Sequence, residues 1–158
     1  MNRQSIFENG DQSLDLCAVF RQIRLDRRCR SVMESSALLS KRLLDYFENC
    51  LEHFVLKEHM FLNPKISITF LADKLHTNRT YVSRAIHSLY GVSFSEFVSV
   101  LRIEYSKNLL KKFRLNIECV ASACGYQYVS QFSRKFTEVV GVTPSTWRQY
   151  VLDGIGRQ

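Results

Sequence analysis

Hydrophobic residues recur at three- and four-residue steps through much of the chain, which is the spacing of one face of an α-helix. Between residues 38 and 62 this spacing predicts one amphipathic helix that ends before Pro64. Beyond Pro64 we find no alternating pattern of the kind that indicates a β-strand. We therefore expect an all-α fold. The apolar positions of the first helix are Leu39, Leu43, Leu44, Phe47, Leu51, Phe54, Val55 and Met60.

Two short helices are predicted at equivalent places, forty-nine residues apart. Ser67 is a suitable N-cap for the first, and Asn116 for the second. A break follows each, at residues 76–78 and 125–127, and the offset between the copies changes from 49 to 50 in the second break. One residue has therefore been inserted in that turn. The inward positions are Ile68, Leu71, Ala72 and Leu75 in the first helix, and Ile117, Val120, Ala121 and Cys124 in the second.

A longer helix with one apolar and one polar face follows each break. Both end near a glycine, Gly91 or Gly141, and both are followed by a new cap, Ser93 or Thr143. A short helix, a tight turn and a longer helix form a helix-turn-helix unit, so two such units are expected. The inward positions are Val82, Ala85, Ile86 and Leu89 in the first copy, and Val129, Phe132, Phe136 and Val139 in the second.

The segment between the two units has the length of a rigid spacer. Helical spacing continues from Ser93 to about Lys112, roughly 19 residues or ~28 Å. Successive major grooves on one side of B-DNA lie ~34 Å apart. We therefore expect one chain to place two recognition helices in consecutive grooves of a single duplex.

The charge distribution agrees with a polyanionic partner. The formal net charge is +7, and residues 64–150 hold twelve basic and five acidic side chains, so the whole excess lies in the segment with the repeat. Arginine can bond guanine, glutamine suits adenine, and lysine more often holds phosphate. The expected base contacts are Thr80, Ser83, Arg84, Gln127, Ser130, Gln131 and Arg134. The expected phosphate contacts are Asn78, Arg79, Lys107, Lys111, Lys112, Ser133, Lys135 and Arg148, with Lys74 and Arg114 in the wider basic set.

No motif for catalysis or for a metal is present. His53 and His59 lack the HExxH arrangement, and no Gly-rich phosphate loop or GxSxG occurs. The five cysteines form no CxxC pair, so we expect reduced, mostly buried thiols and neither a disulfide framework nor a zinc site. We therefore expect a protein that is not an enzyme and has no cofactor. No apolar run approaches the ~20 residues of a membrane span, and no signal peptide is indicated, so a cytoplasmic location is expected.

Residues 66–150 resemble the DNA-binding domain of AraC/XylS-type bacterial transcriptional regulators. The resemblance implies about seven helices in a homeodomain-like arrangement, engagement of adjacent major grooves by a monomer, and regulation of transcription. It also implies a place beside the bacterial nucleoid. The stretch "TNRTYVSR" is similar to the versions found in Bacteroidetes regulators. The matching residues are Leu71, Ala72, Leu75, Asn78, 81–84, Gly91, Phe94, Arg102, Leu109, Leu110, Ile117, Ala121, Gly125, Tyr126, Phe132, Arg134, Phe136, Gly141, 143–144 and Arg148.

Three positions depart from the family pattern. Thr137 stands where a lysine is common, Trp147 replaces a usual tyrosine, and Val129 stands where several relatives have a polar residue. The family also usually has a separate sensing or dimerisation domain, for which the residues before Leu38 leave too little room. Either the chain is a stand-alone regulator or it is the end of a longer protein.

The domain organisation expected from these patterns is an AraC-type domain at 38–151 between two flanking segments. Residues 1–37 form an N-terminal extension, partly helical or disordered, and 152–158 form a tail. Within the domain the expected elements are a first helix-turn-helix unit at about 67–90, a connecting helix at about 94–112, a second unit at about 117–140 and a final helix at about 144–152.

Double-stranded DNA is the expected partner, and RNA polymerase is a candidate second one. The chain is expected to be a monomer or a weak dimer, and its sequence names no effector. The alternative is a helical protein-interaction module whose two polar faces bind an acidic partner. Discrimination between base sequences separates the two, because only DNA readout depends on base identity.

Overall fold

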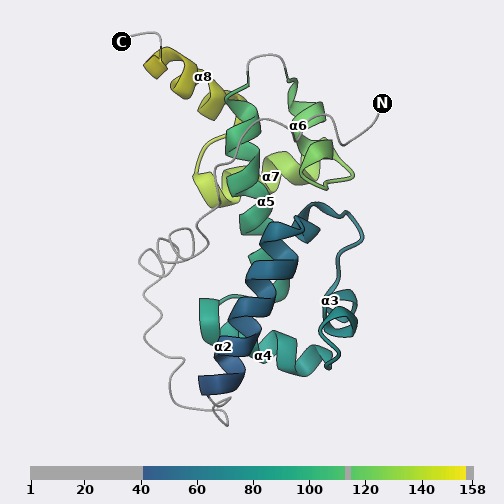
Figure 1. The fold of residues 1–158 in the computed structure, drawn as a ribbon. Helices are drawn as coiled ribbons and strands as arrows, with labels where there is room; N and C mark the ends of the chain where they lie inside the picture. Colours follow the sequence, from purple (N-terminus) through teal and green to yellow (C-terminus); the bar gives the residue numbers. More distant parts are fainter. Residues whose placement is uncertain (1–40, 113–114, 156–158) are drawn as a thin grey trace.

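The computed structural model describes residues 41–112 and 115–155 of the 158-residue chain. Within these ranges the protein has seven α-helices and no β-strand, which confirms the expected all-α fold (Figure 1). The expected N-terminal extension at 1–37 lies outside the described residues. The helices are α2 (Lys41–Leu51), α3 (Ile68–Lys74), α4 (Arg79–Tyr90), α5 (Phe94–Leu110), α6 (Ile117–Ala123), α7 (Val129–Val140) and α8 (Pro144–Ile155).

The prediction of one continuous helix up to residue 62 is wrong. The α-helix ends at Leu51, a π-helical turn follows at Glu52–Lys57, and a separate 3-10 turn occupies Met60–Leu62. His59 interrupts the helical path because its backbone is left-handed, with φ of 51°. The interruption keeps Val55 and Phe61 both buried in the same core.

The predicted caps of both helix-turn-helix units are confirmed. Ser67 Oγ accepts a hydrogen bond from the Phe70 amide at 3.1 Å, and Asn116 Oδ1 accepts one from the Cys119 amide at 2.7 Å. The caps that follow the units behave in the same way. Ser93 Oγ accepts from the Glu96 amide at 3.2 Å, and Thr143 Oγ1 accepts from the Thr146 amide, also at 3.2 Å. Each bond satisfies an amide that the first helical turn would otherwise leave unpaired.

The two turns have the same backbone path except for one residue. His76 and Gly125 each follow the C-cap residue of the short helix, Leu75 or Cys124, and both have positive φ, 50° and 81°. The next amides, of Thr77 and Tyr126, bond the equivalent carbonyls of Ala72 and Ala121. The inserted residue is therefore Gln127, which stands between Tyr126 and Tyr128, the N-cap residue of α7.

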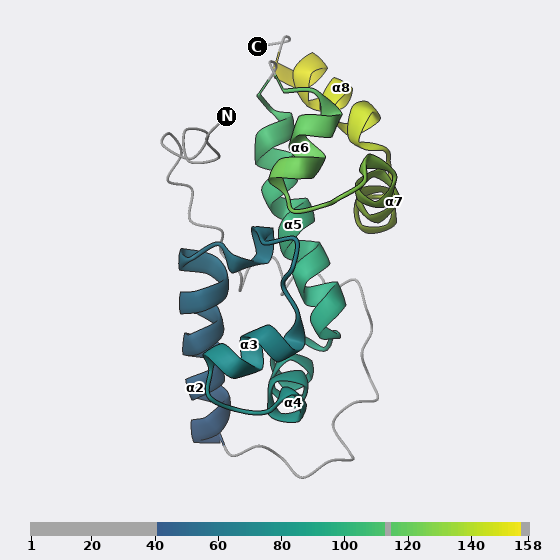
Figure 2. The ribbon, with the colours of Figure 1, turned by 90° about the vertical axis from the view of Figure 1, so that its right-hand side faces the viewer.

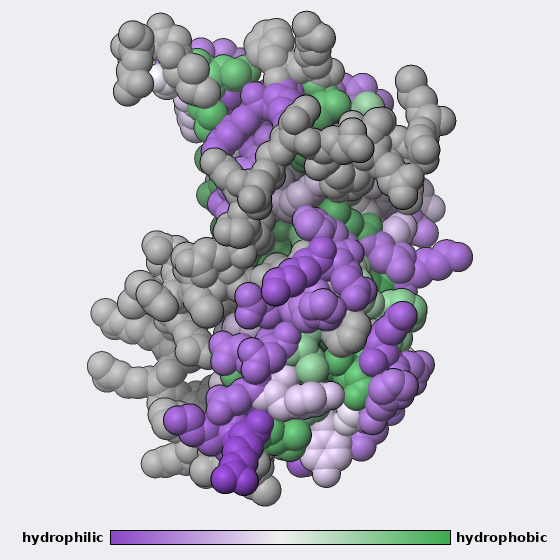
Figure 3. All heavy atoms as spheres, viewed as in Figure 1, coloured by the Kyte–Doolittle hydropathy of each residue, from purple (hydrophilic) through white to green (hydrophobic). Residues whose placement is uncertain are grey.

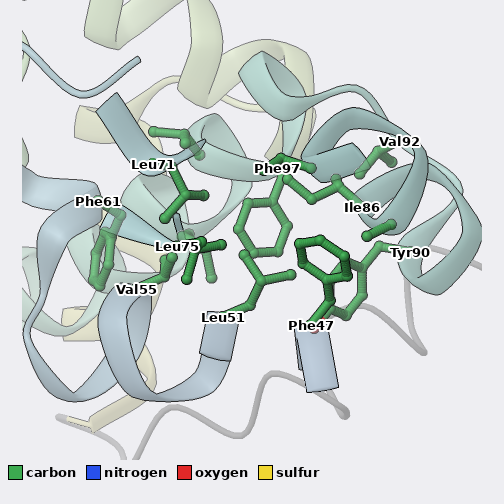
Figure 4. Close-up of a cluster of buried hydrophobic side chains, with 14 of the residues drawn as sticks. Phe47, Leu51, Val55, Phe61, Leu71, Leu75, Ile86, Tyr90, Val92 and Phe97 are labelled. Atoms are coloured by element: carbon green, nitrogen blue, oxygen red, sulfur yellow. The ribbon is translucent and has the colours of Figure 1, made fainter. Parts of the chain in front are cut away.

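Each helix-turn-helix unit packs its own hydrophobic core against a different part of α5. The first core includes Val82, Ile86 and Phe97, as well as Phe47 and Leu51 from α2 (Figure 4). The second core is built around Phe132 and Phe136 of α7 with the inner face of α6. Because α5 is 17 residues long, about 25 Å, it runs through both halves and joins them (Figure 2).

One inward position of the second unit was wrongly predicted. Val139 is exposed, whereas the neighbouring Val140 packs against the second core. After Phe132 and Phe136, the next four-residue step reaches 140 and leaves 139 at the edge of the apolar stripe. The other three predicted inward residues of α7 lie in or against the core: Val129, Phe132 and Phe136.

Candidate nucleic-acid interface

The outer face of α4 holds an uninterrupted set of polar side chains. Thr80, Ser83 and Arg84 are all exposed, while Val82, Ala85 and Ile86 on the opposite face are buried. Arg79 is the first residue of the helix and is also exposed. The packing of α4 on α2 and α3 therefore turns the predicted base-contacting residues of the first unit to the outside.

The outer face of α7 repeats this arrangement. Ser130, Gln131 and Arg134 are exposed, and Gln127 is exposed in the turn that leads into the helix. Phe132 and Phe136 hold the opposite face in the second core with no exposed surface. The predicted base contacts of the first unit thus lie on one face of α4, and those of the second unit lie on one face of α7 and in the turn before it.

The two helices are presented in a similar way. In Figure 1, α4 and α7 both lie crosswise to α5, one toward each end of it, and Figure 2 looks nearly along both helices. The shorter helices α3 and α6 lie beside them and lead into their N-terminal ends. A support helix that delivers the N-terminal turn of a second helix to the surface is the geometry by which helix-turn-helix proteins enter a major groove.

Arg84 and Arg134 make no ion pair within the described residues. Both side chains are exposed, so their guanidinium groups are available for two parallel hydrogen bonds to one acceptor pair. The competing explanation for each arginine, a surface salt bridge, is therefore not observed in this part of the chain. This availability favours a role in binding.

Several of the predicted phosphate contacts already have partners in the protein. Lys107 Nζ lies 2.6 Å from Glu104 Oε1, and both side chains are half-buried. Lys135 Nζ lies 2.9 Å from Glu138 Oε2. A phosphate contact by either lysine requires that this ion pair be shared or broken. Lys111 and Lys112 are exposed at the C-terminal end of α5, and Arg114 lies outside the described residues.

Asn78 has a local task as well as a predicted phosphate contact. Its Oδ1 accepts a hydrogen bond from the Tyr81 amide at 3.0 Å and so caps α4. The amide nitrogen of the same side chain remains a donor that can point outward. Ser133 is half-buried, and its carbonyl oxygen accepts a hydrogen bond from Thr137 Oγ1 at 2.9 Å.

Arg148 differs from the other predicted phosphate contacts because it is half-buried. Its Nε and Nη2 atoms are enclosed and have no hydrogen-bond partner among the described residues. A contact with phosphate through these two atoms would require the side chain to swing outward. The phosphate contact of Arg148 stays a prediction.

Sequence reasoning missed two exposed tyrosines on this surface. Tyr81 is 43% exposed in the first turn of α4, and Tyr128, the N-cap residue just before α7, is 63% exposed. Their phenol rings can contact a thymine methyl group or a sugar, and their hydroxyls can bond phosphate. The available signal was their position, since each lies within three residues of an arginine or glutamine already predicted to contact bases.

The inner side of the second turn is apolar and strongly desolvated. Burial raises the pKa of the Cys124 thiol to about 12, and burial also raises the pKa of the Tyr126 hydroxyl to about 12. Tyr105 on α5 shows the same effect, with its pKa raised to about 12 by burial. These groups are neutral at physiological pH and serve packing. Contrary to the expected burial of most thiols, Cys119 on α6 is exposed.

No group of three or more His, Cys, Asp or Glu side chains in residues 41–112 and 115–155 could hold a metal ion. None of the helices described is both long and apolar enough to cross a membrane. On the face shown in Figure 3, hydrophilic side chains cover most of the surface over α2 and α3.

Comparison with known proteins decides the family. A family model described as a helix-turn-helix domain matches residues 71–150, which include the first unit from the middle of α3 onward, the connecting helix, the second unit and part of α8. The chain belongs to the AraC-type helix-turn-helix family. The family resemblance seen in the sequence is therefore confirmed.

A sequence relative and a solved structure each match about two thirds of this chain or more. The HTH-type transcriptional regulator YtdP of Bacillus subtilis is 27% identical over 103 residues, which cover 65% of this chain and 13% of YtdP. The C-terminal domain of AraT, a response regulator of Geobacillus stearothermophilus, superposes with a TM-score of 0.57 at 25% identity, covering 72% of this chain and 88% of that domain. The chain spans less than half of the length of the curated relatives that it matches.

A third similarity comes from a complex. The DNA-binding domain of AdpA, a global transcriptional factor solved with a target DNA, has a TM-score of 0.58 at 19% identity. The superposition covers 66% of this chain and 90% of that domain. At this identity the likeness shows the shared fold.

Proposed function

We propose that this chain regulates transcription by inserting α4 and α7 into successive major grooves of one DNA duplex and reading a different half-site with each. The observation that carries the proposal is a pair of exposed arginines, Arg84 and Arg134, for which the described part of the chain supplies no ion-pair partner. They occupy equivalent positions, fifty residues apart, on the two outer faces.

Three further features support the proposal. The fold is shared with the AdpA domain solved on its target DNA. The helix α5 is about 25 Å long, and α4 and α7 lie toward its two ends. This arrangement suits a separation of α4 and α7 of the order of one helical turn of DNA, ~34 Å. The basic excess of residues 64–150 favours association with a polyanion at any sequence.

The proposal divides the polar surface by task. Base edges are contacted from the first unit by Thr80, Ser83 and Arg84. The second unit contacts them with Gln127, Ser130, Gln131 and Arg134, whereas the lysines at the end of α5 contact phosphate. Because Gln127 is one extra residue in the second turn, the two helices present different side chains at their N-terminal ends. The two half-sites should therefore differ in sequence.

The proposal assigns no catalytic activity to the chain and places it in the cytoplasm, where a bacterial regulator meets the chromosome. RNA polymerase is a candidate second partner for a regulator of this kind. The competing function is an interaction module for an acidic protein. It would use the same basic surface, but it would not distinguish one base sequence from another.

The decisive experiment is selection of bound duplexes from a random pool with the purified chain. We expect a site with two unlike halves whose centres lie about 10 base pairs apart, because half-sites on one face of B-DNA repeat at that spacing. The double variant Arg84→Ala, Arg134→Ala is the control and should enrich no site. Failure of the parent chain to enrich any sequence would favour the acidic-partner alternative.

A further inference from the structure

Arg102 lies at the point of α5 where the two cores meet. The preceding residue, Leu101, is buried in the first core, and the following residue, Ile103, is buried in the second. The side chain of Arg102 is half-buried between them. It is therefore placed to contact both halves of the molecule.

Toward the first half, the guanidinium group bonds two main-chain carbonyls. Arg102 Nε donates to the carbonyl oxygen of Phe61 at 2.7 Å, and Nη2 donates to that of Asn63 at 2.8 Å. Phe61 is fully buried in the first core, so the acceptors are fixed to that core. The planar guanidinium with donors at fixed angles holds the two carbonyls in one geometry, which a single ammonium group cannot do.

Toward the second half, the same group lies over the ring of Tyr126. The guanidinium carbon is 5.3 Å from the ring centroid, within the range of a cation–π contact. Tyr126 belongs to the turn between α6 and α7 and packs against Phe132 with ring centroids 5.5 Å apart. The position of the guanidinium is thus transmitted to the first turns of α7.

Gly125 brings the two halves into direct main-chain contact. A Cβ atom added there would lie 2.5 Å from the carbonyl oxygen of Leu62 and 3.1 Å from Arg102 Nη2. Side chains do not fit at such distances, so only glycine allows this approach. The contact joins the turn of the second unit to the 3-10 turn of the first core.

The helix-turn-helix fold does not itself require these contacts. The first unit forms the same turn with His76 and Thr77 at the equivalent positions, and its left-handed residue has a side chain. Burial also lowers the pKa of Arg102, which means that enclosing this charge costs free energy. Among the described residues no carboxylate pairs with it. The arrangement costs free energy, and a turn of this kind forms without it. Its effect should therefore lie in the contact between the two units.

We propose that Arg102, with Gly125 against Leu62, is a positioning residue that fixes the angle and distance between α4 and α7, and so sets the half-site spacing that the chain accepts. The inference deepens the proposed function and rests on it for its consequence on DNA. Its structural part does not depend on DNA and can be tested without it.

The first experiment measures the distance between the two helices in the free protein. Spin labels are introduced through an unnatural amino acid at Ser88 and Glu138, which are exposed, equivalent positions on α4 and α7, so that the native cysteines stay in place. Pulsed electron paramagnetic resonance should give one narrow distance distribution for the parent chain. Arg102→Met should broaden it, and Gly125→Ala should shift it.

Gly141→Ala is the matched control. Gly141 has a φ of 86°, close to the 81° of Gly125, but a Cβ there meets nothing within 4 Å. Both alanine variants therefore have the same backbone strain, and only Gly125→Ala adds the clash with Leu62. Gly141→Ala should keep the parent distribution. The inference is overturned if Arg102→Met and Gly125→Ala also keep it, and Gly125→Ala decides alone if Arg102→Met does not fold.

The second experiment uses the duplex selected by the parent chain, with zero to three base pairs inserted between its halves. Each base pair rotates one half-site by about 35° and moves it by about 3.4 Å. Rigidly linked helices should lose roughly 100-fold in affinity over the series, as expected when two linked contacts can no longer form together. Arg102→Met should lose only a few fold.

A merely structural role predicts a different result, because a less stable protein binds every member of the series more weakly by the same factor. Parallel spacing profiles for parent and Arg102→Met would therefore overturn the positioning role. If the random pool yields no site at all, the proposed function fails, while the distance measurement still tests the junction.

Discussion

His76 and Gly125 occupy equivalent positions in the two turns, and both have a left-handed backbone although only one of them is glycine. The reason for the difference is the surroundings. Gly125 faces the carbonyl of Leu62, whereas His76 is exposed and has room for its side chain. The histidine nevertheless has a strained backbone, since a side chain in the left-handed region costs about 1–2 kcal/mol.

His76→Gly should therefore stabilise the protein. We expect a gain of about 0.5–1 kcal/mol in the free energy of unfolding, since relief of the strain exceeds the entropy that glycine adds to the unfolded chain. Chemical denaturation monitored by circular dichroism measures it. His87→Gly is the control, because it removes a histidine from regular helix in α4 and should lower stability. A loss of stability in His76→Gly would contradict the strain argument.

Tyr128→Asn should also stabilise the fold. Tyr128 is the N-cap residue that precedes α7 and makes no side-chain hydrogen bond to the helix, whereas Asn78 caps α4 at the equivalent place. The free energy of unfolding should be about 1 kcal/mol higher with asparagine at position 128 than with alanine, which is the typical value of an N-cap bond. Denaturation midpoints of Tyr128→Asn and Tyr128→Ala give the comparison. Equal midpoints would show that α7 cannot use the cap.

Arg84→Ala and Arg134→Ala should each relax base preference in a different half of the selected site. A bidentate contact to guanine contributes about 1–3 kcal/mol of discrimination between bases. Each variant should therefore lose affinity for the duplex with the correct base, but not for random DNA. Lys111→Ala is the contrasting variant. It should weaken binding to all duplexes alike and reduce the salt dependence by about one charge. Binding titrations on single-base variants of the site measure both effects, and unchanged preference in both arginine variants would refute two-helix readout.

Stability should fall as pH rises above about 9. Burial raises the pKa of Cys124 from its ordinary 9.0, and those of Tyr105 and Tyr126 from 10.0, to about 12. Below pH 9 these groups are protonated in both states, and their contribution is fully present. Between pH 9 and 12 the unfolded chain releases protons that the folded chain retains, so each group loses stabilisation of at most about 1.4 kcal/mol for each unit by which its pKa is raised.

Denaturant unfolding between pH 7 and 11 measures this loss. The variant Tyr105→Phe cannot ionise at that position and should show a shallower decline than the parent. Lysines and other tyrosines are the same in both proteins, so the difference between the two curves isolates Tyr105. Identical curves would mean that Tyr105 is not buried in solution.

Much of the fold could be predicted from the sequence because its signals are local. The caps at Ser67, Asn116, Ser93 and Thr143 depend on residues only three positions away, and the inserted residue was visible as a change of offset. The break before Met60 was missed because His59 adopts a left-handed backbone without a glycine or proline to announce it.

The junction could not be predicted for a different reason. Arg102 matches a family position, but its partners Phe61 and Asn63 lie 41 and 39 residues away in the sequence. No periodicity connects these residues. Likewise the ion pairs of Lys107 and Lys135 depend on rotamers that a helical pattern does not specify. The outer faces of α4 and α7 were predictable, whereas the means by which they are held relative to each other was not.

The course of α5 through both cores also bears on how the protein loses its structure. Leu101 and Ile103 are only two residues apart, yet each is fully buried in a different core. Loss of the backbone hydrogen bonds of α5 near residues 101–103 therefore removes packing from both cores together. We expect thermal melting to be a single cooperative transition, in which damage to one helix-turn-helix unit lowers the melting temperature of the other as well.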